Sequence, residues 1–83
     1  MYEVVLSHQA RKALKRATHE DRLRFRDAFE RLSIDPRSGK RLHGELEGWF
    51  ALRVGGMRAI YELNTDTATV VVHDIGSRGD IYK

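Results

Sequence analysis

The chain has 83 residues, with 15 Lys and Arg against 12 Asp and Glu, and its net charge of +3 comes mostly from arginine. Its length indicates one domain over residues 1–83, because chains divide into several domains only beyond about 250 residues. The lack of cysteine excludes disulfides and cysteine-ligated metal sites, and no apolar run reaches the ~18 residues of a membrane span. Without a signal-peptide pattern at its N-terminus, the chain is expected to be cytoplasmic. Its arginine-rich basic charge favours an anionic partner, either nucleic acid or an acidic protein.

The first half of the chain predicts one strand and two helices. Large side chains alternate over residues 2–6, as in a strand, and Ser7 is placed to cap a short helix after it. Thr18 with Asp21 three residues later resembles a capping box that starts a second helix. Asp35-Pro36 ends this helix, because the residue before proline is pushed out of the helical region. The apolar stripes of the two helices are Ala10, Ala13, Leu14 and Ala17, and Phe25, Ala28, Phe29 and Leu32.

The second half predicts three antiparallel strands in a meander. Residues 37–48, with three glycines and mixed charge, are expected to form a connecting loop. Strands are predicted at 49–54, 57–63 and 69–75, joined by a tight turn at Gly55-Gly56 and a second turn at 64–67. The resulting fold class is α+β: an N-terminal strand, a helical hairpin and a three-stranded meander, with both helices on one face of the sheet.

Arginines on the meander strands are the main functional candidates. Alternation along the strands places Arg53 and Arg58 together on the face away from the helices. Arg78 and Tyr82 follow the last strand, where a loop can bring them to the same surface. Guanidinium groups fixed in place suit a phosphodiester, and a phenol can exchange a proton or stack on a base. The alternative is that the arginines pair with acids such as Glu62 or Asp74.

Other polar and aromatic residues leave alternatives open. The four histidines have no short metal-ligand spacing, which argues against a metal site. His43 and His73 are candidates for proton transfer, because imidazole is the side chain most often used as a general acid or base. Trp49, on the open face, is either a base-stacking platform or part of the core. The basic helix face is either solvated or binds nucleic acid; its members are Arg11, Lys12, Lys15 and Arg16.

Several segments together resemble the RelE/ParE toxin superfamily over nearly the whole chain. The opening strand and helix at 2–14 match, as does Leu32-Ser33-Ile34-Asp35-Pro36 at the end of the second helix. Residues 42–49 resemble the family's entry into the meander, residues 52–61 its arginine-bearing hairpin, and residues 75–82 its Arg- and Tyr-containing tail. Each motif is weak alone, but their order and spacing are specific.

The resemblance implies a RelE-like fold and a toxin neutralised by a cognate, RelB-like antitoxin. On the RelE side it implies an endoribonuclease that cleaves mRNA in the ribosomal A site by 2′-hydroxyl attack, with no cofactor and no metal. By position, Arg58 and Arg78 would be catalytic on the phosphate and Tyr82 would orient a nucleotide. The nucleic-acid-binding residues by the same resemblance are Arg53, Lys40 and Arg41.

The chain departs from the resemblance at one important place. Some RelE members carry lysines on the first meander strand, where this chain has Trp49 and Ala51, so the general base is unassigned. His43, His73 or Lys40 could take that role. Two other functions stay open: a ParE-like inhibitor of DNA gyrase, and a degenerate toxin that acts only in an antitoxin complex and in autoregulation of its operon. In the degenerate toxin, the basic helix face would bind an acidic antitoxin segment.

Overall fold

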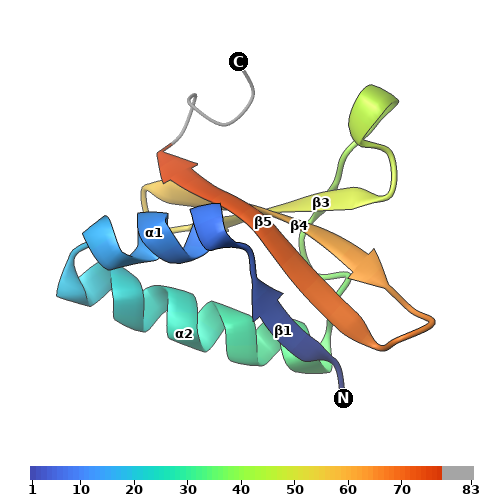
Figure 1. Cartoon of the computed structure of the whole chain (residues 1–83), viewed down its shortest axis with the longest axis horizontal. Helices are drawn as coiled ribbons and strands as arrows, with labels where there is room; N and C mark the ends of the chain where they lie inside the picture. The colour runs from blue at the N-terminus through green and yellow to red at the C-terminus, as the bar shows by residue number, and fades with distance from the viewer. Residues whose placement is uncertain (78–83) are drawn as a thin grey trace.

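A computed structural model describes residues 1–77. The elements follow the predicted order (Figure 1), and their bounds are β1 (Glu3–Leu6), α1 (His8–Arg16), α2 (His19–Ile34), β2 (Lys40–Arg41), the short 3₁₀ turn η1 (Gly44–Leu46), β3 (Trp49–Val54), β4 (Met57–Asn64) and β5 (Thr69–Ser77).

Both helices begin at the residues that the sequence predicts. The Ser7 side chain accepts a hydrogen bond from the Ala10 N–H at 3.0 Å, and the Thr18 side chain accepts one from the Asp21 N–H at 3.1 Å. These bonds satisfy backbone donors that have no partner within the first helical turn. Helix α2 ends at Ile34; its C-cap residue Asp35 still donates its N–H to the Arg31 carbonyl at 2.7 Å, and Pro36 follows.

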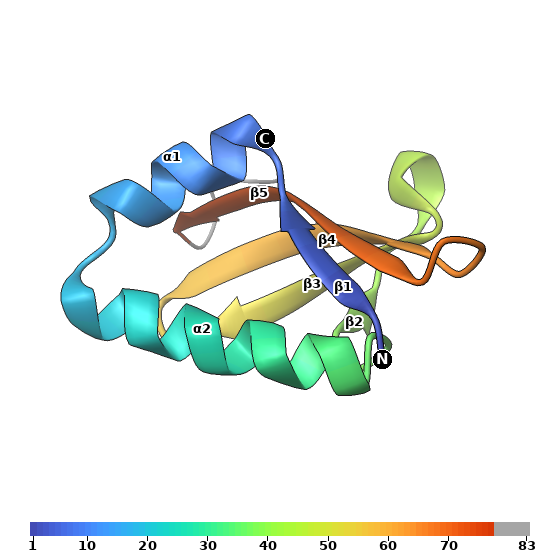
Figure 2. The ribbon, with the colours of Figure 1, turned by 60° about the horizontal axis from the view of Figure 1, so that its bottom comes forward.

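The strands form one five-stranded sheet in the order β1-β5-β4-β3-β2. The meander β3-β4-β5 is antiparallel, as predicted, and β1 adds to its edge in parallel with β5. Figure 2 shows α1 and α2 together on one side of this sheet, which confirms the predicted α+β arrangement. Within residues 1–77 no helix packs on the opposite face of β2, β3 and β4, which is called here the open face.

The segment 37–48 differs from the predicted connecting loop. It contains the two-residue strand β2, which pairs antiparallel with β3, and the turn η1. Two residues are too few to show any periodicity, so the strand is recognisable only from its pairing.

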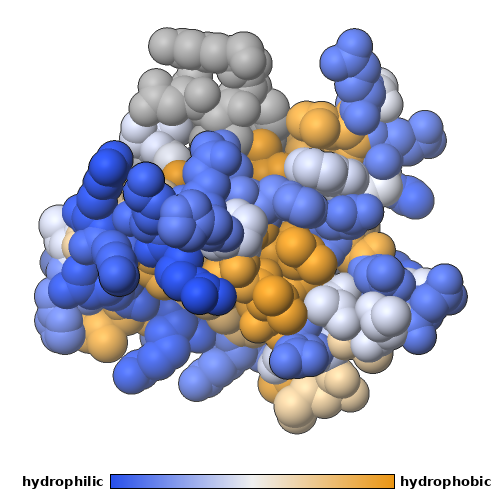
Figure 3. Space-filling model, in the orientation of Figure 1, coloured by the Kyte–Doolittle hydropathy of each residue, from blue (hydrophilic) through white to orange (hydrophobic). Residues whose placement is uncertain are grey.

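The core lies between the helices and the sheet. Its largest fully buried side chains are Tyr61, Phe25, Leu32, Val70 and Val72. Hydrophilic side chains cover α1, while apolar side chains gather over β1 and the neighbouring β5 (Figure 3). Within residues 1–77 neither helix is long and apolar enough to cross a membrane.

Candidate phosphate-binding site

One buried tyrosine fixes the segment that leads from α2 into β2. The Tyr61 hydroxyl donates to the Pro36 carbonyl at 2.7 Å and accepts from the Gly39 N–H at 3.1 Å. Its ring stacks on Phe50 with 5.3 Å between centroids. Burial raises the pKa of Tyr61 above its usual value of 10.0, the Gly39 hydrogen bond opposes this rise, and the Asp35 carboxylate adds to it. The sequence interpretation missed this role, although a tyrosine on a core-facing strand position signals a hydroxyl that needs a partner.

The anchored segment places Lys40 on the open face. Lys40 pairs with Ala51 and Arg41 with Phe50 across β2 and β3. Paired residues share a face, so Lys40 lies on the open face with Ala51, whereas Arg41 lies on the same side as the buried Phe50. The structure therefore separates two residues that the sequence interpretation grouped as nucleic-acid-binding.

The turn between β3 and β4 brings two arginines together. Gly55 adopts a φ of 63°, the left-handed conformation that a two-residue hairpin turn needs. This turn sets Arg53 directly opposite Arg58, as the alternation of the strands predicted. Like charges at directly opposed positions destabilise a sheet, so a bound anion would relieve the repulsion between them.

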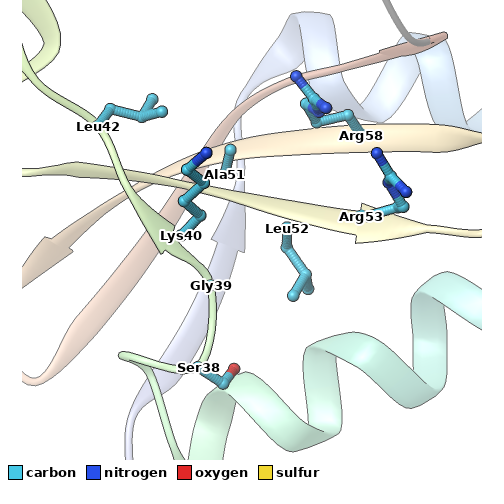
Figure 4. A pocket seen from close by; sticks show the side chains of 8 residues that line it. All are labelled: Ser38, Gly39, Lys40, Leu42, Ala51, Leu52, Arg53 and Arg58. Atoms are coloured by element: carbon cyan, nitrogen blue, oxygen red, sulfur yellow. The ribbon is translucent and has the colours of Figure 1, made fainter.

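These cations line one open pocket of about 610 Å³. In Figure 4 the charged ends of Lys40, Arg53 and Arg58 point to the same side of the sheet, while Leu52 points toward α2. The lining residues are Ser38, Gly39, Lys40, Leu42, Ala51, Leu52, Arg53 and Arg58. Among the described residues the lining thus has three cations and no carboxylate, a charge pattern suited to a phosphate.

The remaining predicted site residues lie elsewhere. Arg78 and Tyr82 fall outside the described residues 1–77. His43 precedes η1 and is exposed, and neither it nor His73 lines the pocket. Of the three residues considered for proton transfer, Lys40 is the one that the described structure places in the pocket.

A second cluster occupies the same face next to the pocket. The rings of Trp49 and His73 stack with 4.3 Å between centroids and 11° between planes. His73 Nε2 lies 3.0 Å from Glu62 Oε1. Glu62 therefore pairs with a histidine, and Asp74 accepts hydrogen bonds from the Gln9 side chain and the Ile75 N–H. Within residues 1–77 no group of three or more His, Asp or Glu side chains could hold a metal ion.

Comparison with known proteins agrees with this fold. The family model described as ParE toxin of type II toxin–antitoxin systems matches residues 4–82. Toxin RelG of Mycobacterium tuberculosis is 42% identical over 57 residues, which span 68% of this chain and 66% of RelG, just under two thirds of its length.

Solved structures show the same architecture. A chain of the toxin–antitoxin complex RelBE2 from Mycobacterium tuberculosis superposes with a TM-score of 0.82 at 33% identity, over 93% of this chain and 98% of that chain. The isolated RelE toxin of Escherichia coli superposes with a TM-score of 0.83 at 18% identity, over 99% of this chain and 92% of that one, and shows the fold alone. The chain is therefore a toxin of the RelE/ParE superfamily of type II toxin–antitoxin systems.

Proposed function

We propose that this toxin is an endoribonuclease that acts in the cytoplasm on the ribosome and cleaves mRNA in the A site. The observation that supports this proposal is the convergence of Lys40, Arg53 and Arg58 on one pocket of the open face. A phosphodiester would be held there by three cationic side chains on paired strands. These side chains would need little rearrangement when negative charge develops on the phosphate oxygens.

The proposed reaction uses the RNA's own 2′-hydroxyl. Its oxygen attacks the adjacent phosphorus, and the bond from phosphorus to the 5′-oxygen breaks, leaving a 2′,3′-cyclic phosphate and a 5′-hydroxyl. The attacking oxygen loses a proton and the leaving oxygen gains one. Between attack and bond breakage, extra negative charge forms on the phosphorane oxygens. A single preorganised hydrogen-bond donor typically stabilises such a transition state by about 2.7–4 kcal/mol.

Each cation has a separate proposed role. Arg58 stabilises the phosphorane oxygens, with Arg78 as a second stabiliser or as the proton donor to the leaving group. Arg53 and Lys40 hold the backbone phosphate, and Lys40 is also the candidate proton acceptor. Arg41, on the other side of β2, would contact a phosphate outside the pocket, and Tyr82 would orient a nucleotide.

The test is primer extension on an mRNA translated in a cell-free reaction, with and without ribosomes. The chain is compared with Arg58→Ala, with Arg78→Ala, and with Arg26→Ala as a control, because the Arg26 side chain is 68% exposed on α2. We expect new 5′ ends that require ribosomes, Arg58 and Arg78 but not Arg26. Intact mRNA in the presence of folded, unsubstituted chain would reject the proposal.

A ParE-like inhibitor of DNA gyrase is the second candidate. Two observations favour it: the matching family model describes ParE toxins, and Trp49 and Ala51 occupy the strand positions where some RelE members carry lysine. Inhibition of supercoiling by purified gyrase, with mRNA intact, would select this function. Loss of both activities with antitoxin binding retained would select the degenerate toxin that acts only in the antitoxin complex and in operon autoregulation.

A cognate antitoxin, resembling RelB, is the proposed protein partner. Solved relatives of the same fold include toxin–antitoxin complexes from Mycobacterium tuberculosis and Escherichia coli. The helix α1 offers an exposed basic face to an acidic antitoxin segment.

A further inference from the structure

Trp49 lies on the open face although a tryptophan is costly to leave in water. It is half-buried, and it is not among the described residues that form or border the hydrophobic core. Its ring instead stacks on His73, two strands away, with the planes 11° apart. A flat, partly exposed aromatic pair outside the core is the kind of surface on which nucleobases stack.

The histidine of this pair is held in place from two sides. His73 Nε2 lies 3.0 Å from Glu62 Oε1 on β4, and the His73 carbonyl accepts a hydrogen bond from the Ser7 hydroxyl at 2.7 Å. Glu62 itself is paired with Trp49 across β3 and β4. The Glu62 contact and the Trp49 stack orient the ring, and the Ser7 bond holds the backbone of His73, so the stacking surface exists before any ligand arrives.

An irregularity in β5 brings His73 to this surface. Ile60 pairs with Asp74 but Tyr61 pairs with Val72, so the register shifts and His73 is the extra residue of a bulge. Bulges often re-aim a side chain beside a functional site. Here the bulge places an imidazole over the open face while Val72 stays in the core.

The aromatic pair adjoins the cationic pocket. Trp49 is two residues from Ala51, which lines the pocket, and two residues along a strand span about 7 Å. The Leu42 N–H donates to the Trp49 carbonyl at 2.9 Å, and Leu42 also lines the pocket. Lys40 pairs with Ala51, so this distance leads from Trp49 to the Lys40 side of the pocket, which is within the reach of one nucleotide from its base to its phosphate.

We propose that Trp49 and His73 form a nucleobase-binding subsite, on which a base of the RNA stacks while its phosphate lies between Lys40, Arg53 and Arg58. Glu62 is a positioning residue that holds the imidazole parallel to the indole. The inference rests on the proposed function in that the ligand is RNA, and the three pocket cations supply the charge complementarity for it. The proposal gives a role to Trp49, which occupies a strand position where some RelE members carry lysine.

The test is direct binding without ribosomes, using the full chain and two fluorescein-labelled probes. One is a 2′-O-methyl trinucleotide, which lacks the attacking hydroxyl and so stays uncut. The other is an abasic trinucleotide with the same phosphates. We expect the abasic probe to bind about tenfold more weakly, which is the size of effect typical of one base on an aromatic side chain.

A second readout comes from the protein itself, because Trp49 is its single tryptophan. An unlabelled base-bearing probe should quench the tryptophan fluorescence saturably, and the abasic probe should not. Equal affinity for the two probes, or quenching by both alike, would overturn the subsite.

Variants separate the subsite from a purely structural role. Trp49→Leu and His73→Ala should each bind the base-bearing probe only about as tightly as the abasic one, while Trp49→Phe, which keeps a flat ring, should retain most of the preference. Glu62→Gln should weaken binding of the base-bearing probe alone. If Trp49→Leu unfolds, as circular dichroism would reveal, His73→Ala decides the matter and leaves the reporter in place. Unchanged preference in a folded His73→Ala protein would contradict the inference.

The outcome is distinguishable from that of the nuclease proposal. Arg58→Ala should weaken binding of both probes equally, because it removes a phosphate contact and leaves the rings intact. Cleavage of mRNA without base-dependent binding would reject the subsite alone. Base-dependent binding without cleavage would reject the nuclease alone.

Discussion

Tyr61 and Gly39 fit together so closely that position 39 has no room for a side chain. The Gly39 N–H donates to the Tyr61 hydroxyl at 3.1 Å. A Cβ at position 39 would lie 2.7 Å from that hydroxyl oxygen and 2.8 Å from the Ala51 carbonyl oxygen. Through this contact a core residue of β4 holds the segment that delivers Lys40 to the pocket.

Removing the Tyr61 hydroxyl should loosen that segment. Tyr61→Phe leaves the Gly39 N–H and the Pro36 carbonyl without their partner, and we expect a loss of about 1–3 kcal/mol in the free energy of unfolding. Urea unfolding measures it. Tyr2→Phe is the matched control, because the Tyr2 hydroxyl has no hydrogen bond within the described residues. An equal loss in both variants would contradict the anchoring role.

The raised pKa of Tyr61 predicts a loss of stability in strong alkali. Because the pKa of this hydroxyl is higher in the folded chain, its stabilising contribution is complete below the unfolded value of about 10 and is lost as the pH rises through the folded value. The difference in unfolding free energy between the unsubstituted chain and Tyr61→Phe should therefore stay constant below about pH 10 and shrink above it. A constant difference across this window would show that the hydroxyl ionises equally easily in both states.

Reversing the charge of one hairpin arginine should stabilise the fold and weaken RNA binding. Arg53→Glu replaces two opposed positive charges with an opposed pair of unlike charges, which typically contributes about 0.2–1 kcal/mol. We expect a higher urea midpoint, together with weaker binding of the RNA probes. Arg53→Gln removes only the repulsion, so its stability should lie between that of the unsubstituted chain and that of Arg53→Glu. If Arg53→Glu is less stable than Arg53→Gln, the argument is contradicted.

The two helix caps should differ in importance. Ser7→Ala removes the bond from the Ala10 N–H and also the 2.7 Å bond from the hydroxyl to the His73 carbonyl. Thr18→Ala removes one exposed cap, at a cost of about 1 kcal/mol. Chemical denaturation should therefore show the larger loss for Ser7→Ala. A smaller loss there would mean that the tie between α1 and β5 adds nothing.

The basic face of α1 should speed association with the antitoxin. Arg11→Glu with Lys12→Glu reverses two exposed charges in the N-terminal half of α1, where neither side chain is part of the core, so we expect the fold to be preserved. The association rate measured at low salt should fall about tenfold or more, because electrostatic steering is lost. Arg26→Glu with Arg37→Glu changes the net charge equally and is the control. Equal rates for the two double variants would reject α1 as the steering surface.

Local signals in the sequence determined much of this protein. Ser7, Thr18 and Asp35-Pro36 set the bounds of both helices, because caps and proline act on their immediate neighbours. The Gly55-Gly56 turn determined that Arg53 faces Arg58, since a two-residue turn fixes the register of its hairpin.

The remaining features of the site follow from tertiary contacts. Lys40 reaches the pocket because it lies on a two-residue strand that pairs with β3. The hydrogen bond from Gly39 to the distant Tyr61 holds this strand in place. Trp49 meets His73 because a bulge in β5 shifts the register across β4, and no pattern near either residue encodes that shift. The physical reason is common to both: these contacts join segments far apart in the chain, so their geometry follows from the packing of the whole sheet and not from the local sequence.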